Sequence, residues 1–232
     1  MESIEYKKGY KNFLGCKIDL RFRPFIPRKE TEFWVKEAIQ DINLSRAKSR
    51  ESLSILDIFS GSGCIGISIL KHTKNSQMIF AEIDKKFIRQ IKLNLKINKI
   101  NSRRYKVIQS DIFKNVTGIF DYIFANPPYV ALKNKHLVQK SVLDFEPHKA
   151  LFGGEDGLLL IRKFLKDARK YLKGGGLPAA CLSGRQGRQG KIYMEFDHLQ
   201  KKELEKLLKK LNYKNYKIHK DQFKKYRWLI AK

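Results

Sequence analysis

The sequence has few cysteines, no long apolar run and few acidic residues for its size. Its 232 residues include three cysteines, and these form neither a Cys-x-x-Cys pair nor a Cys/His cluster, so neither a disulfide framework nor a metal site is predicted. No stretch reaches the roughly 18 to 20 apolar residues that a membrane span requires, and the acidic residues near the start argue against a secretory signal. These absences predict a globular protein with reduced thiols, no membrane contact and a cytoplasmic location.

The charged residues are unequally divided between the two signs. Lys and Arg number 49 against 23 Asp and Glu, which gives a formal net charge of +26. Such a surface attracts phosphate backbones, so contact with the ribosome or another RNA is one interpretation. The other is that lysine simply occupies ordinary solvated positions, and charge alone does not decide between them.

Short apolar runs alternate with amphipathic stretches from Ser54 onward. The runs are "SILDIF", "QMIFAEID", "YKVIQSD" and "FDYIFAN", and the first two are followed by "GCIGISILK" and "KKFIRQIKLNLKIN". This alternation predicts an α/β fold with a parallel sheet and helices on both faces. With "KIYMEF" and the closing runs "YKIHK" and "RWLIAK", the pattern predicts a Rossmann-like seven-stranded sheet whose seventh strand is antiparallel.

The first 50 residues differ in pattern from the rest. Residues 1–50 are predicted to form an extension with a hairpin in "NFLGCKIDLRFRPFI" and a helix in "PRKETEFWVKEAIQDI", followed by a polar linker, "NLSRAKSRES". Residues 51–232 are predicted to form the main domain. Within it, residues 174–190 are rich in turn formers and lack periodicity, which predicts a long exposed loop inserted between a helix and a strand.

A glycine-rich turn, "SGSG", follows the strand that ends near Phe59. Glycine lets the backbone approach a ligand, and the helix that follows offers unpaired N–H groups at its N-terminus. Gly61, Gly63 and Gly66 also fit the G-x-G-x-x-G pattern of dinucleotide-binding proteins, so this turn alone leaves an NAD-dependent dehydrogenase open.

Two acidic residues follow the next strands at the same edge of the predicted sheet. Asp84 ends the run "QMIFAEID", where a carboxylate can bind both ribose hydroxyls of an adenosine. Asp111 takes the corresponding place one strand further and could accept a hydrogen bond from an adenine amino group. A solvated strand end and a turn cap are the alternatives for these two residues.

The motif Asn126-Pro127-Pro128-Tyr129 follows the fourth strand, at the edge that carries the glycine turn. Because the two prolines have no N–H, this turn displays carbonyl acceptors without competing donors. Asn126 adds a side-chain carbonyl and Tyr129 adds a flat face. Two acceptors suit a substrate NH2 group, whereas hydride transfer to a nicotinamide has no use for them.

These residues resemble the "NPPY" signature of amino-group methyltransferases that use S-adenosylmethionine and act on adenine, cytosine or glutamine side chains. The segments "FIPRKETEFWV", "FEPHKALFGGEDGLLLIRKFL", "MEFDHLQ" and "DQFKKYRWLIA" are similar to segments of the HemK/PrmC family of protein-glutamine methyltransferases. The resemblance extends from about Tyr6 to Ala231. It begins where the family's hairpin begins, so the family's preceding helical domain is expected to be missing.

The resemblance implies a methyltransferase-type sheet, S-adenosylmethionine as cofactor and a glutamine in the Gly-Gly-Gln loop of a peptide chain release factor as substrate. The cofactor-binding residues that it implies are Phe59, Ser60, Gly61, Ser62, Gly63, Asp84, Asp111, Ile112 and Asn126. The acceptor-binding residues are Asn126, Pro127, Pro128 and Tyr129, of which Asn126, Pro127 and Tyr129 are assigned to catalysis. Phe59 stands where the family usually has a glycine. An adenine methyltransferase acting on RNA or DNA, and a non-catalytic RNA-binding protein, are the alternatives.

Overall fold

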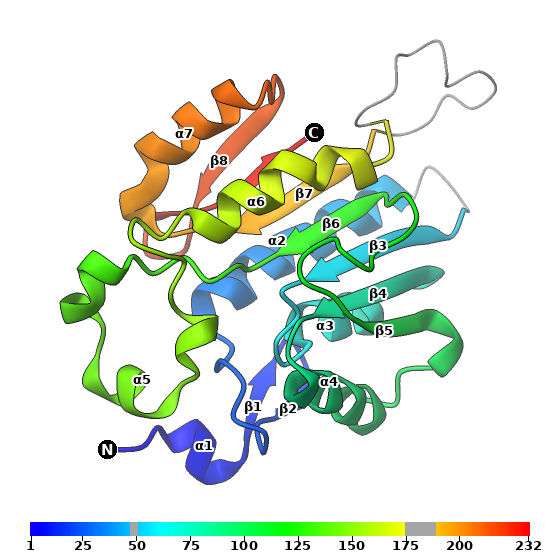
Figure 1. The fold of residues 1–232 in the computed structure, drawn as a ribbon. Coiled ribbons are helices and arrows are strands. Elements are labelled where there is room, and N and C mark those ends of the chain that lie inside the picture. Colours follow the sequence, from blue (N-terminus) through cyan, green and yellow to red (C-terminus); the bar gives the residue numbers. More distant parts are fainter. Residues whose placement is uncertain (47–50, 175–188) are drawn as a thin grey trace.

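A seven-stranded sheet forms the centre of the computed structural model, which describes residues 1–46, 51–174 and 189–232. Its strands are β3 (Leu53–Ile58), β4 (Ser76–Glu82), β5 (Tyr105–Gln109), β6 (Tyr122–Ala125), β7 (Lys191–Glu195), β8 (Tyr216–Lys220) and β9 (Tyr226–Ala231). They lie in the order β5-β4-β3-β6-β7-β9-β8 (Figure 1), and β9 is antiparallel to both of its neighbours. The predicted seven-stranded α/β sheet with an antiparallel last strand is therefore confirmed.

Helices cover both faces of this sheet, as the apolar spacing predicts. Helices α2 (Lys29–Arg46), α3 (Cys64–His72) and α4 (Lys85–Ile97) contribute to one buried cluster, and α6 (Leu159–Ala168) and α7 (Lys201–Lys210) contribute to the other. Two short helices, α1 (Ile4–Lys8) and α5 (Lys140–Phe145), lie outside this layered arrangement (Figure 1). The fold therefore has a hydrophobic core on each side of the sheet.

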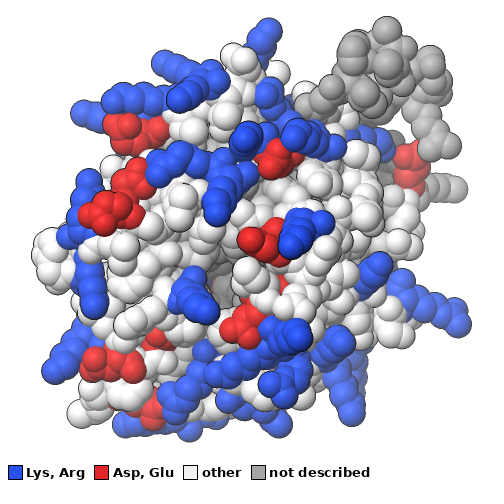
Figure 2. Space-filling model, viewed as in Figure 1, with Lys and Arg blue, Asp and Glu red and all other residues white. Residues whose placement is uncertain are grey.

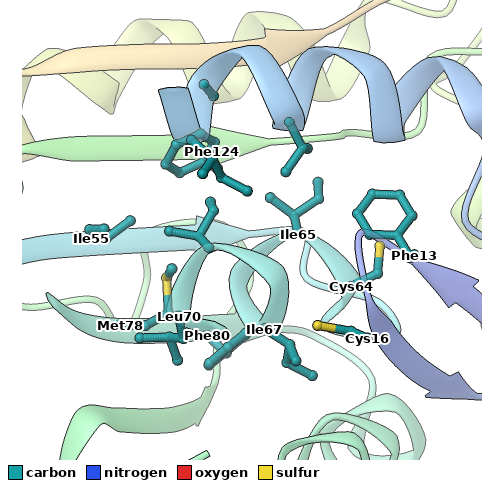
Figure 3. Close-up of a cluster of buried hydrophobic side chains, with 14 of the residues drawn as sticks. Phe13, Cys16, Ile55, Cys64, Ile65, Ile67, Leu70, Met78, Phe80 and Phe124 are labelled. Carbon is teal, nitrogen blue, oxygen red and sulfur yellow. The ribbon is translucent and has the colours of Figure 1, made fainter. Parts of the chain in front are cut away.

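The N-terminal extension shares one of these cores with the main domain. Phe13 and Cys16 of the extension point into a cluster with Ile65 of α3 and Phe124 of β6 (Figure 3). All four side chains are buried, as is Trp34 of α2. The two predicted domains are thus joined through a continuous core.

A hairpin made of β1 (Tyr10–Phe13) and β2 (Cys16–Asp19) belongs to this extension. Its turn residues, Leu14 and Gly15, have φ angles of 46° and 73°. Positive φ at both central positions is the type I′ arrangement, whose twist matches that of the flanking strands. The hairpin predicted here is confirmed.

Side-chain amides of α4 and of the residue that caps its C-terminus pair with the outer edge of β2. Asn98 accepts from the backbone N–H of Lys17 at 3.0 Å and donates to its carbonyl at 2.9 Å. Asn94, one turn earlier, does the same with Asp19 at 2.8 and 3.3 Å. Because an edge strand otherwise presents unpaired backbone groups, these amides complete the hydrogen bonding of the hairpin and fix it to the main domain.

Helix α2 is longer than the sequence patterns predict. Residues 43–46 were expected in the polar linker, but they continue the helix to Arg46. No glycine or proline interrupts them, and the Asn43 side chain donates to the carbonyl of His72 at 3.3 Å. The next four residues of that linker, 47–50, and residues 175–188 of the predicted inserted loop lie outside the described residues. In the described part of the chain, no helix combines the length and the apolar character needed to cross a membrane.

Candidate active site

A cavity of about 620 Å³ lies at the carboxyl ends of the parallel strands. Ligands of open α/β sheets bind at this edge, and the volume falls within the roughly 300 to 1,000 Å³ typical of small-molecule sites. Figure 2 shows a hollow near the centre of the molecular face, with both basic and acidic side chains around it. Of the predicted site residues, the cavity is lined by Phe59, Ser60, Gly61, Ser62, Asp84, Asp111, Ile112, Asn126, Pro127, Pro128 and Tyr129.

Gly63 is the one predicted site residue that does not line the cavity. It precedes α3 with a φ of 79°, and a Cβ at this position would meet the side chains of Ile67 and Ile91 at 3.1 and 3.3 Å. Its glycine is therefore required by the turn and by packing beneath the loop. Gly61, with a φ of 53°, instead presents its backbone in the cavity wall.

Phe59 adopts the left-handed backbone conformation that favours glycine, with a φ of 59°. A residue with a side chain has a cost of roughly 1 to 2 kcal/mol there. The ring of Phe59 packs edge-on against Phe164 of α6, with 6.2 Å between centroids. Glycine adopts this backbone conformation without that cost. This accounts for the glycine that the resembled family usually has at the position of Phe59.

Glu82 ends β4 and Asp84 follows it, but the two have different surroundings. Glu82 is 6% exposed, and its two carboxylate oxygens accept from the backbone N–H groups of Gly61 at 2.8 Å and Asp84 at 2.9 Å. Asp84 is half-buried and caps α4, because its carboxylate accepts from Lys86 N at 2.7 Å. Burial raises the pKa of Glu82, whereas these backbone N–H groups lower it.

This arrangement suits the ribose of an adenosine. Both oxygens of Glu82 retain acceptor capacity beyond the bonds they already receive, and Glu82 lies beside the glycine loop in the cavity wall. Asp84 also lines the cavity, so its role in cofactor binding stays a prediction. Glu82 is the better placed of the two, and its signal in the sequence was its position as the last residue of the strand.

Asp111 and Ile112 follow β5 at the same edge. Ile112 has a φ of 49°, and its carbonyl accepts from the Ser110 hydroxyl at 2.8 Å. This turn directs the segment past the cavity, where Asp111 remains exposed. The contact of Asp111 with an adenine amino group and the contact of Ile112 with the cofactor stay predictions.

The Asn126 to Tyr129 turn forms another wall of the cavity. Asn126 Nδ2 lies 3.5 Å from the hydroxyl of Thr31 on α2. The Tyr129 hydroxyl donates to Glu195 at the end of β7 at 2.9 Å. Burial, together with the neighbouring Glu195, raises the pKa of Tyr129 well above that of a free phenol, so Tyr129 stays neutral.

The backbone of this turn is closely supported from behind. A Cβ at Gly153 would lie 2.4 Å from the carbonyl oxygen of Pro128, and one at Gly157 would lie 2.2 Å from that of Tyr129. The Gln200 side chain donates to the same Tyr129 carbonyl at 2.9 Å. Because these contacts leave no room for a side chain, the two glycines allow the turn to pack against the "GGEDG" segment.

Sequence patterns did not identify Thr31, Glu195 and Arg227 as part of the cavity, yet all three line it. Glu195 is 1% exposed and accepts three hydrogen bonds, two of them from α2. Burial raises the pKa of Glu195, whereas these donors lower it. Thr31 lies in "KETE" and Glu195 lies in "MEF", two segments that resemble the family. Nothing in either segment shows that the two residues meet.

Comparison with known proteins identifies relatives of this chain. The model of the family "Methyltransferase small domain" matches residues 41–148. The release factor glutamine methyltransferase of Lactococcus lactis subsp. lactis is 31% identical, over all of this chain and 77% of its own length. That of Rhodopirellula baltica is 35% identical over 72% of this chain and 57% of its own length.

Solved structures show the same fold at lower identity. The human Mettl16 catalytic domain in complex with MAT2A 3′UTR hairpin 6 aligns with a TM-score of 0.67 and 17% identity, covering 94% of this chain and 75% of that one. This likeness shows the fold alone, whereas the likeness to the Lactococcus protein extends over the whole chain at the level of sequence. The chain therefore belongs to the release factor glutamine methyltransferase family, a family of S-adenosylmethionine-dependent enzymes.

Proposed function

We propose that this methyltransferase modifies the side-chain nitrogen of a glutamine in the Gly-Gly-Gln loop of a peptide chain release factor. The observation that carries the proposal is the cavity shared by the Gly61 loop and the turn from Asn126 to Tyr129. The names of the relatives support a release factor as the protein substrate.

The cofactor half of the cavity fits an adenosine with a charged side chain. The Gly61 and Ser62 backbone lines the cavity, and Glu82 offers acceptors for two hydroxyl groups. When bound, S-adenosylmethionine supplies an electrophilic methyl group. These residues would hold it in the cavity that Asn126 also lines.

The acceptor half has to activate a poor nucleophile, because the lone pair of an amide nitrogen is shared with its carbonyl. Asn126 Oδ1 and the backbone carbonyl of Pro127 are the two acceptors for the hydrogens of the substrate NH2 group. Fixing both hydrogens orients the nitrogen and favours its pyramidal form as the new bond develops. The ring of Tyr129, anchored through its hydroxyl to Glu195, supplies a flat face for the amide plane.

An adenine amino group in RNA or DNA is the second candidate acceptor. The formal net charge of +26 favours it, and this charge would also favour contact between a glutamine enzyme and the ribosome. A flipped base, however, carries an unstacking cost of a few kcal/mol. A glutamine flanked by glycines reaches a narrow cavity without that cost.

Labelled S-adenosylmethionine distinguishes these acceptors. The enzyme is incubated separately with a release factor, with ribosomal proteins and with RNA, and the products are digested with protease or nuclease. We expect protease-sensitive label in the release factor that disappears when the loop glutamine is replaced by alanine. Nuclease-sensitive label would overturn the proposal in favour of the adenine acceptor.

A further inference from the structure

A buried carboxylate lies behind the acceptor half of the cavity, at the end of β7. Glu195 Oε2 accepts from the Thr31 hydroxyl and from Trp34 Nε1, both at 2.7 Å. Its other oxygen, Oε1, accepts from the Tyr129 hydroxyl at 2.9 Å. Burial raises the pKa of Glu195, whereas its three donors and Arg227 in the cavity wall lower it. Trp34 Nε1 can only donate, and with Glu195 ionised both carboxylate oxygens only accept, so all three bonds have a defined direction.

The direction of the Thr31 bond has a consequence for Asn126. The Thr31 hydroxyl has a single proton, and this proton is used in the bond to Glu195. Towards Asn126 the Thr31 oxygen can therefore only accept. It lies 3.5 Å from Asn126 Nδ2, and Thr31 is 1% exposed, so water does not compete for it.

The two ends of an asparagine amide are told apart only by their partners. If the Asn126 amide were flipped, Oδ1 would face an oxygen that has no proton to donate. The observed orientation instead places the NH2 group towards Thr31 and leaves Oδ1 for an acceptor substrate. Asn126 and Thr31 are 95 residues apart in the chain, so helix α2 brings this constraint to the site from the N-terminal extension.

We infer that Glu195 and Thr31 are positioning residues that together orient the Asn126 amide and the Tyr129 ring for the substrate NH2 group. One carboxylate oxygen acts through Thr31 on Asn126, and the other holds Tyr129. Neither residue needs to touch the reacting atoms. The inference rests on the proposed role of Asn126, but it applies equally to a glutamine and to an adenine acceptor.

Three variants test the step through Thr31. Thr31→Val keeps the shape and removes the hydroxyl, and Thr31→Ser keeps the hydroxyl. Trp34→Phe is the matched control, because it removes a donor from the same Glu195 oxygen without touching Asn126. Thr31→Val removes the bond to Glu195 and the bond from Asn126. With the acceptor that the wild-type enzyme methylates, we expect kcat to fall about five- to ten-fold, the range for the loss of the one bond at Asn126. The Kd for S-adenosylmethionine should change less than about two-fold.

Thr31→Ser is expected to restore most of the turnover, and Trp34→Phe to lower the melting temperature while keeping kcat. Equal losses of kcat in Thr31→Val and Trp34→Phe would overturn the inference, because they would indicate a general loss of packing. Wild-type turnover in Thr31→Val would overturn it as well.

A second measurement does not depend on activity. The side-chain 15N–H2 resonances of Asn126, assigned by their loss in Asn126→Ala, should shift in Thr31→Val and stay in place in Thr31→Ser. Unchanged resonances in Thr31→Val would overturn the inference. A wild-type enzyme that labels no acceptor would instead count against the proposed function, and these spectra would still decide the role of Thr31.

Discussion

Replacing Asn94 with alanine should separate two roles of this α4 side chain. One is to hold the N-terminal hairpin, and the other is to support the Gly61 loop. The fully buried Asn94 side chain pairs with the backbone of Asp19 at 2.8 and 3.3 Å and also donates to the carbonyl of Ser62 at 2.9 Å. Asn98 pairs with Lys17 in the same manner but has no bond to the loop. Asn98→Ala is therefore a matched control.

The expected magnitude follows from the number of backbone groups that lose a partner. A buried group left without its hydrogen bond costs about 1 to 3 kcal/mol. Asn94→Ala removes the partner of the buried Ser62 carbonyl and of the two part-buried backbone groups of Asp19, so we expect the free energy of unfolding to fall by about 2 to 4 kcal/mol. Asn98→Ala removes the partner of the two part-buried backbone groups of Lys17, with an expected fall of about 1 to 3 kcal/mol. The released carbonyl of Ser62 should in addition weaken S-adenosylmethionine binding about three- to ten-fold.

Urea unfolding measures the first quantity and isothermal titration calorimetry with S-adenosylmethionine measures the second. Both variants should unfold at lower urea concentration, and only Asn94→Ala should bind the cofactor more weakly. An equal loss of cofactor affinity in Asn98→Ala would refute the reasoning, because it would mean that the loop responds to hairpin docking in general. Unchanged cofactor affinity in Asn94→Ala would refute the role of the Ser62 bond.

Three further predictions concern charged groups. Glu82→Gln should weaken S-adenosylmethionine binding by about 1.5 to 3 kcal/mol, the range for a hydrogen bond to a charged group; calorimetry that shows full affinity would contradict this. Burial raises the pKa of Asp57 from 3.8 to about 8, so the folded state holds the proton more tightly and the free energy of unfolding should fall as pH rises through that interval. In Asp57→Asn the free energy of unfolding should depend less on pH, as measured by urea unfolding at several pH values. An unchanged pH dependence would argue against this role of Asp57. Reversing the charge of Lys209, Lys210 and Lys214 should weaken RNA binding and reduce its dependence on salt, whereas unchanged binding would show that these lysines are only a solvated surface.

The sheet could be predicted from the sequence because its signals are local. Each strand is a short apolar run, and in a parallel sheet the carboxyl ends of all such runs meet at one edge. The turns after β3 and β6 could therefore be assigned to one cavity before any contact was known. Helix ends are less well determined, since a polar segment such as residues 43–46 is compatible with an exposed helix as well as with a linker.

Local sequence patterns do not identify the remaining residues of the site, because these depend on strand ends and on contacts between distant segments. The choice between Glu82 and Asp84 depends on where β4 ends, because the last strand residue faces the glycine loop and the residue two further on caps the next helix. Thr31 and Glu195 lie in a helix and a strand 164 residues apart. No spacing rule connects them, so only the packing of α2 against the sheet shows that they meet.

The N-terminal extension supports the two halves of the cavity by separate routes. Its hairpin is linked to the Gly61 loop through Asn94, which contacts both Asp19 and Ser62. Its helix α2 is linked to the turn from Asn126 to Tyr129 through Thr31 and Glu195. Because no residue is shared between these two routes, damage to the hairpin should appear mainly in cofactor affinity and damage to the start of α2 mainly in turnover. The extension therefore contacts both walls of the cavity, and the boundary near residue 50 does not separate it from the site.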